Sequence, residues 1–167
     1  MIYTNLKSPL GDITASAENN ALTGLWFVGQ KYYPSDKSLW TCDPNYPIFI
    51  ELGRWLEDYF EGKRNAMLPD LKPKGTDFQK TVWEILLEIP FGRVTTYGEI
   101  AKKIASSKGI PSMSAQAVGG AVGHNPISIL IPCHRVVGAN GSLTGYAGGL
   151  EKKKALLCIE KADLACR

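Results

Sequence analysis

The sequence predicts an α+β protein in two parts, with short strands and one helix in the first part and mostly helices in the second. Two observations carry this. Strand-like runs occupy residues 11–28, and helical spacing of apolar residues begins at 48–61 and returns after residue 75. A segment rich in glycine and proline, 62–75, separates the parts. We therefore expect an N-terminal domain with its linker at 1–74 and a C-terminal domain at 75–167.

In the first part, two β-like runs lie at 11–17 and 22–28. The asparagine pair at 19–20 between them favours a hairpin turn. Residues 30–45 are rich in Pro, Asp and Ser, which predicts a loop. Residues 48–61 repeat apolar side chains at helical spacing, which predicts a helix with one face in a core.

The second part begins with a predicted helix capped at 76–77. A capping-box pattern at 96–99 begins a second helix, and a third begins at 112–114 after a break containing glycine and proline. A final helix is predicted over 150–162. Helix, break and helix in a basic region suggest a helix-turn-helix, although the intervening turn is long.

Composition sets broad limits on function. The 167 residues are 44% hydrophobic and 21% charged, which is typical of a globular protein. No apolar stretch approaches the roughly 20 residues of a membrane span, and no secretory signal is visible. The cysteines Cys42, Cys133, Cys158 and Cys166 lack framework spacing, so we expect reduced thiols in the cytoplasm. Two histidines and no Cys-x-x-Cys pair predict no structural metal.

Charge is distributed unevenly along the chain. Residues 1–71 hold 6 basic and 9 acidic side chains, whereas residues 72–167 hold 13 and 7. The basic half suggests an anionic partner such as nucleic acid. A solvated lysine surface is the alternative explanation.

The chemistry is concentrated in a short stretch, 131–136, which follows an apolar run at 127–131. That run predicts a buried strand or strand-like segment. Pro132 stops it, and Cys133 sits at the stop with His134 directly behind. A reactive cysteine needs a base within reach, and imidazole titrates near neutrality. The alternative is a cysteine that only fills a core.

The Pro-Cys-His-Arg motif sits in a wider pattern. Residues 125–138 and 145–150 closely resemble the O6-alkylguanine-DNA alkyltransferases, also called methylated-DNA–protein-cysteine methyltransferases. The resemblance extends to 117–121, 94–101 and 8–11, so it covers nearly the whole chain.

The resemblance implies a ribonuclease H-like N-terminal α/β domain followed by a mostly helical, winged helix-turn-helix-like domain. It implies DNA repair by stoichiometric, irreversible transfer of an alkyl group to Cys133 after base flipping. The substrate would be O6-alkylguanine in double-stranded DNA, with O4-alkylthymine as a second candidate. It further implies a monomer that needs no cofactor, no metal and no obligate protein partner.

The family's catalytic arrangement falls on four residues. Cys133 would be the nucleophile, His134 the base acting through a water, and Glu160 the residue that orients His134. Tyr97 would donate a proton to guanine N3. Without the resemblance, Glu160 reads as a solvated glutamate and Tyr97 as a half-buried tyrosine at the start of a helix.

The resemblance also assigns binding residues. Those expected around the flipped base are Val136, Tyr146, Ala147, Gly148 and Asn125. Those expected at the DNA are Ala115, Gln116, Ala117, Gly119, Gly120 and Arg135. Gln116 stands where many relatives carry an arginine that fills the gap left by the flipped nucleotide. The small residues would equally suit close helix packing, and Asn125 would suit an ordinary Asn-Pro turn.

Three other functions are compatible with parts of the pattern. A lesion sensor of the alkyltransferase-like kind would lack the reactive cysteine, which is present here. A cysteine hydrolase would use a Cys-His-Glu set but would need an oxyanion hole. A DNA-binding regulator would use the helix-turn-helix alone.

Overall fold

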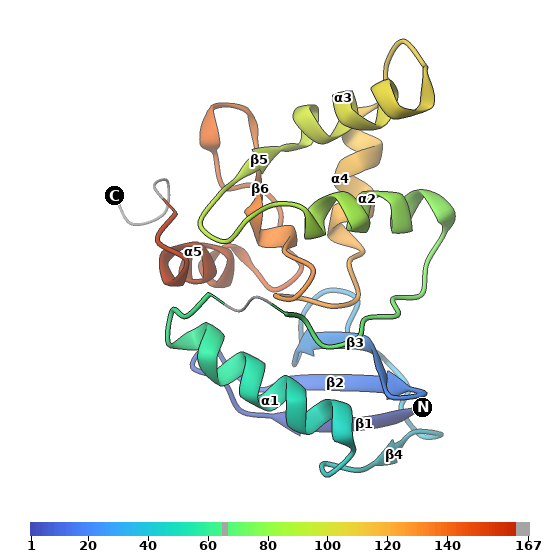
Figure 1. The fold of residues 1–167 in the computed structure, drawn as a ribbon, viewed down its shortest axis with the longest axis vertical. Helices are drawn as coiled ribbons and strands as arrows, with labels where there is room; N and C mark the ends of the chain where they lie inside the picture. Colours follow the sequence, from blue (N-terminus) through green and yellow to red (C-terminus); the bar gives the residue numbers. More distant parts are fainter. Residues whose placement is uncertain (65–66, 163–167) are drawn as a thin grey trace. The chain divides into compact units, whose positions relative to one another are not determined.

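The computed structural model describes residues 1–64 and 67–162 and divides into two compact units, each with its own core (Figure 1). The chain enters the second unit after Lys74 and later returns to the first for one short segment. The first unit comprises Met1–Lys74 and Pro126–Leu130, and the second comprises Gly75–Asn125 and the chain from Ile131 onward.

The first unit is a four-stranded sheet with one helix along it (Figure 1). The strand order is β3-β2-β1-β4; only β1 and β4 pair in parallel. Helix α1 (Pro47–Phe60) buries one face, led by Phe49 and Tyr59. The strands are β1 (Ile2–Leu6), β2 (Ile13–Glu18), β3 (Ala21–Phe27) and β4 (Thr41–Cys42).

The predicted hairpin and helix of this unit are confirmed. Asn19 and Asn20 join β2 to β3 with φ of 50° and 57°, the left-handed pair that a two-residue hairpin turn requires. Strands β1 and β4 were not predicted. Every side chain from Ile13 to Ala17 is buried, so β2 is a central strand with both faces covered.

The apolar run at 127–131 is buried, but the prediction of a strand there is wrong. Only Ile127 pairs, as an isolated bridge beside Leu25 of β3. Ile129 then adopts φ 71°, a left-handed conformation uncommon for a β-branched residue. The run therefore turns immediately after one bridge, because its backbone leaves the extended region at Ile129.

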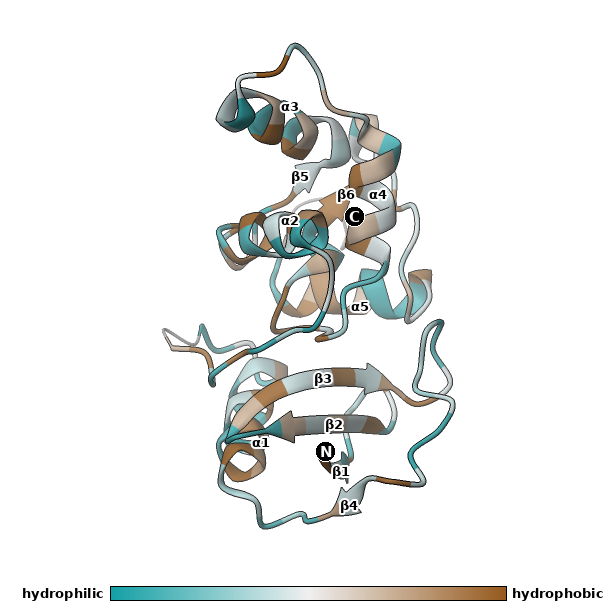
Figure 2. Ribbon diagram, turned by 90° about the vertical axis from the view of Figure 1, so that its right-hand side faces the viewer, coloured by the Kyte–Doolittle hydropathy of each residue, from teal (hydrophilic) through white to brown (hydrophobic). Residues whose placement is uncertain are grey.

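The second unit is mostly helical, and Figure 2 shows hydrophobic residues on each of its first three helices. Thr76 caps the first with a full capping box, and Thr96 and Ser114 cap the next two, as the sequence predicts. Its elements are α2 (Asp77–Leu87), β5 (Thr95–Thr96), α3 (Tyr97–Lys108), α4 (Ala115–Gly123), η1 (Cys133–Arg135), β6 (Val136–Val137), η2 (Ala139–Gly141) and α5 (Leu150–Ile159).

Two contacts fix the positions of the elements around the cysteine. The indole Nε1 of Trp83 on α2 donates a buried 2.9 Å hydrogen bond to the Ala121 carbonyl on α4. The short strands β5 and β6 pair in parallel, with Thr96 opposite Val137. Because α3 begins directly after β5 and η1 directly precedes β6, this pairing brings the start of α3 to the end of η1.

Candidate active site around Cys133

Cys133 is the first residue of η1 and is 6% exposed. Its N–H donates to the Ile131 carbonyl at 2.8 Å, and its own carbonyl accepts from the Val136 N–H. Burial raises the pKa of the thiol above its ordinary value. A hydrogen bond from Asn125 and the charge of Lys153 oppose that rise only in part. The resting group is therefore a thiol that needs a base in order to react.

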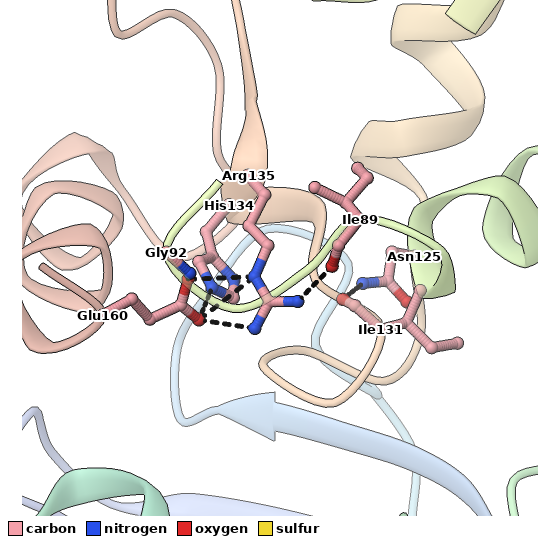
Figure 3. Close-up of polar contacts among 7 residues, drawn as sticks. All are labelled: Ile89, Gly92, Asn125, Ile131, His134, Arg135 and Glu160. Carbon is pink, nitrogen blue, oxygen red and sulfur yellow. Dashed lines mark hydrogen bonds and ion pairs between the residues drawn. The ribbon is translucent and has the colours of Figure 1, made fainter. Parts of the chain in front are cut away.

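His134 and Glu160 form a buried pair (Figure 3). Imidazole Nε2 lies 2.8 Å from Glu160 Oε1, and both side chains are fully buried. Burial lowers the pKa of His134; Glu160 raises it, while the charges of Arg135 and Lys153 lower it further. At neutral pH the ring is thus a neutral base. Because Nε2 faces a carboxylate, we assign the proton to Nε2 and the basic lone pair to Nδ1.

Glu160 follows the last residue of α5 and is ionised although it is buried. Burial alone would raise its pKa, but hydrogen bonds from His134 and Arg135 outweigh that effect and lower it to about 2. The backbone N–H of Gly92 also approaches Oε2 at 3.5 Å. A Cβ on Gly92, which has φ 81°, would lie 3.0 Å from the Glu160 carbonyl, so glycine permits this close approach.

Arg135, which the resemblance assigns to the DNA, has a side chain that is only 11% exposed and engages groups of its own unit. Its Nε lies 2.9 Å from Glu160 Oε2, and its Nη2 lies 2.8 Å from Oε1. Nη1 donates to the Ile89 carbonyl at 2.6 Å. The guanidinium is therefore committed to groups inside the second unit.

Tyr97 and Lys153 meet at one carbonyl. The Tyr97 hydroxyl donates to the Thr144 carbonyl at 3.1 Å, and Lys153 Nζ donates to the same oxygen at 2.8 Å and to Gly145 O at 3.0 Å. Burial raises the pKa of Tyr97, which keeps the hydroxyl protonated. Burial lowers the pKa of Lys153 to about 8.

Sequence reasoning missed Lys153, because a run of three lysines reads as a solvated surface. A signal was nevertheless present. Lys153, Leu156, Leu157 and Glu160 are spaced i, i+3, i+4 and i+7, which is the buried stripe of a helix. All four are at most 1% exposed.

The residues expected around a flipped base come from three segments of the second unit. Asn125 is buried and its Nδ2 donates to the Ile131 carbonyl at 2.7 Å, which ties the end of α4 to the residues before Cys133. Val136 is buried in β6. Tyr146, Ala147 and Gly148 are half-buried in the loop that leads to α5.

The residues expected at the DNA lie on α4, apart from Arg135. Ala115, Gln116, Ala117 and Gly120 are exposed. Gly119 is half-buried, and a Cβ there would lie 3.7 Å from Cδ1 of the Tyr97 ring. The exposed residues at the start of α4 are therefore small, apart from Gln116. Of the remaining cysteines, Cys42 is exposed and Cys158 half-buried, and Cys166 lies outside the described residues.

Comparison with known proteins finds relatives that match nearly the whole chain. The family model for the DNA-binding domain of 6-O-methylguanine DNA methyltransferase matches residues 77–162, and that for its ribonuclease-like domain matches residues 1–68. The methylated-DNA–protein-cysteine methyltransferase of Mycobacterium tuberculosis is 46% identical over 160 residues, covering 96% of this chain and 92% of the relative. The chain belongs to this methyltransferase family.

Other members of the family match this chain over similar lengths. The methylated-DNA–protein-cysteine methyltransferase of Methanosarcina acetivorans is 44% identical, covering 96% of this chain and 98% of its own. The crystal structure of M. tuberculosis OGT in complex with DNA matches with a TM-score of 0.84 at 43% identity, covering 96% of this chain and 93% of that one. The resemblance and the fold class inferred from the sequence are both confirmed.

The ionised state of Glu160 should appear in the pH dependence of stability. Its folded pKa of about 2 lies below its ordinary value of 4.5, so it stabilises the fold above pH 4.5. That contribution is lost as the pH falls from 4.5 towards about 2. We expect the free energy of unfolding to drop by a few kcal/mol over this window, since one pKa unit corresponds to about 1.4 kcal/mol.

Chemical denaturation at several pH values measures this effect. The Glu160→Gln variant should show a shallower dependence in the same window. Glu84→Gln, which removes an exposed carboxylate of α2, is the matched control and should follow the wild type. Equal pH dependence in the wild type and Glu160→Gln would contradict the assignment.

Lys153 should affect the pKa of the Cys133 thiol. Its ammonium lowers the pKa of Cys133, so Lys153→Met should raise that pKa further. The thiolate absorbance of each protein, minus that of its Cys133→Ser counterpart, measures the titration. Lys154→Met removes the exposed neighbour and should leave the curve unchanged. A Cys133 curve that is identical with and without Lys153 would refute the coupling.

Proposed function

We propose that this protein repairs DNA by transferring the alkyl group of O6-alkylguanine to Cys133, irreversibly and once per molecule. The observation that carries the proposal is a buried thiol directly before a buried imidazole–carboxylate pair, in a chain that belongs to the methylated-DNA–protein-cysteine methyltransferases. A thioether is a stable product, so the protein is consumed by the reaction. O4-alkylthymine is the second candidate substrate.

The transfer is a direct displacement at carbon. The bond from Cys133 Sγ to the alkyl carbon forms as the bond from that carbon to guanine O6 breaks. His134 takes the thiol proton through a water, and Glu160 stabilises the resulting imidazolium. Tyr97 gives its proton to guanine N3, and solvent later returns the imidazolium proton to the tyrosinate. Guanine thus leaves neutral, with no oxidant or cofactor required.

The substrate base must leave the duplex to reach a thiol that is 6% exposed. We propose that α4 approaches the DNA through Ala115, Ala117 and Gly120, whose small side chains permit close contact. The Ala147 N–H would bind guanine O6, with Tyr146 and Gly148 beside the ring. The carbonyls of Cys133 and Val136 would accept from the exocyclic amine, and Asn125 would hold the turn that presents them.

The same proposal covers organisation and location. Residues 1–74 would form the N-terminal domain with its linker, and residues 75–167 the DNA-binding and alkyl-transfer domain. The partner would be double-stranded DNA, with the protein acting as a monomer in the cytoplasm. Within residues 1–64 and 67–162, no helix is long and apolar enough to cross a bilayer.

Intact-protein mass after incubation with duplex DNA carrying one O6-methylguanine tests the reaction. We expect the protein to gain one CH₂, mapped to the Cys133 peptide, at a stoichiometry of one per molecule. The gain should be absent in Cys133→Ser. Tight binding of lesion DNA without a mass gain would instead indicate a sensor. The absence of both a mass gain and binding of lesion DNA would reopen the hydrolase and regulator alternatives.

Gln116 is exposed near the start of α4, where it would fill the gap left by the flipped base. We expect Gln116→Ala to slow transfer from duplex DNA while transfer from a single-stranded oligonucleotide stays unchanged, because only the duplex has a gap. Gln116→Arg should steepen the salt dependence of duplex binding by about one unit of slope. Unchanged duplex rate and affinity in Gln116→Ala would exclude this role.

A further inference from the structure

The feature that the proposed mechanism leaves unused is the guanidinium of Arg135. It joins three segments of the second unit: η1, which carries it; the turn after α2, through Ile89; and the end of α5, through Glu160 (Figure 3). Three of its nitrogens are engaged within 2.9 Å of an oxygen. Such a two-pronged contact with a carboxylate fixes its plane as well as its distance.

The geometry around Glu160 shows what this contact achieves. Oε1 accepts from both His134 Nε2 and Arg135 Nη2 at 2.8 Å, while Oε2 accepts from Arg135 Nε at 2.9 Å. Without Arg135, Oε1 would keep the hydrogen bond from His134 and Oε2 the 3.5 Å approach of the Gly92 N–H, so the carboxylate plane could tilt. The fork removes this freedom, so Oε1 stays in the direction that sets the imidazole ring.

Arg135 also contributes to the charge balance at the base. The groups that act on His134 are Glu160 on α5, which favours the imidazolium, and Arg135 on η1 and Lys153 on α5, which oppose it. The uncharged thiol of Cys133 lies next to it in the chain. Without Arg135, the carboxylate would act on the ring with one opposing cation fewer, and the imidazole would hold a proton more readily.

We infer that Arg135 is a positioning residue for alkyl transfer: its guanidinium holds the Glu160 carboxylate in the orientation that fixes His134 as a neutral base, and it does not contact DNA. The inference about transfer rests on the function proposed above. Lysine could supply the charge but not the planar fork, so charge and geometry can be separated by substitution.

The primary test needs no activity. An NMR pH titration of the His134 ring should show a higher pKa in Arg135→Gln than in the wild type, because an opposing cation is gone. Arg135→Lys should remain close to the wild type, since the charge is kept. His124 provides a reference signal, and Arg93→Gln, at an exposed arginine, is the control for loss of one charge. An unchanged His134 titration in Arg135→Gln would overturn the inference.

The second test measures transfer to Cys133 in single-turnover experiments. Both Arg135 variants should be slowed about tenfold or more, because neither can hold the carboxylate in its fork. In a Glu160→Gln background, Arg135→Gln should cause no further slowing, since Arg135 acts through Glu160. That double variant also carries no unpaired buried carboxylate, so it guards against loss of folding. Additive slowing would count against the inference.

The third test addresses the DNA contact directly. If Arg135 touched a phosphate, Arg135→Gln would reduce the slope of log affinity against log salt by about one unit on undamaged duplex. We expect no change in that slope, and a reduction would overturn the inference. If the wild type transfers no alkyl group, the proposed function fails by itself, and the His134 titration still decides the role of Arg135.

Discussion

The active centre depends on one buried anion. Glu160 is 1% exposed at the end of α5, and a carboxylate in that position persists only if its charge is met by hydrogen bonds and opposite charge. His134 and Arg135 donate hydrogen bonds to the carboxylate. Gly92, which has no side chain, brings its backbone N–H to 3.5 Å from Oε2. The carboxylate therefore connects η1, the turn after α2 and α5.

The balance of charge around Cys133 keeps its thiol protonated at rest. Burial favours the neutral form of the Cys133 thiol. Burial also favours the neutral form of the His134 imidazole, which can therefore accept a proton. A thiol that is protonated and 6% exposed reacts slowly with oxidants, because the thiolate is the reactive form. The charge of Lys153 favours a thiolate when the proton leaves, without generating one at rest.

The sequence predicted the elements whose signals are local. Thr76, Thr96 and Ser114 cap helices where their side chains accept from the backbone N–H three residues ahead, and Asn19-Asn20 forms the hairpin turn. The run at 127–131 was misread because its composition fits a strand, whereas the left-handed Ile129 that ends the pairing has no signature in apolar spacing. The motif places Cys133 directly before His134, and the structure adds that both side chains are buried.

What the sequence could not predict are contacts between residues far apart in the chain. Arg135 was assigned to DNA by the family resemblance, and only the fold shows that its guanidinium donates to Glu160, 25 residues later in the chain. Lys153 was hidden in a lysine run, although its spacing to Leu156 and Glu160 marked the buried face of α5. In both cases the side chain can be buried because a polar partner lies beside it in the fold, and that partner comes from another segment of the chain.

The Thr144 carbonyl lies between two side chains of the candidate site. It accepts hydrogen bonds from both the Tyr97 hydroxyl and Lys153 Nζ. If Tyr97 donates to a guanine ring nitrogen as proposed, its hydroxyl must release this carbonyl. Lys153 remains bound at 2.8 Å, so the carbonyl stays satisfied. The Thr144 carbonyl therefore keeps a hydrogen-bond donor from α5 whether or not the Tyr97 hydroxyl is bonded to it.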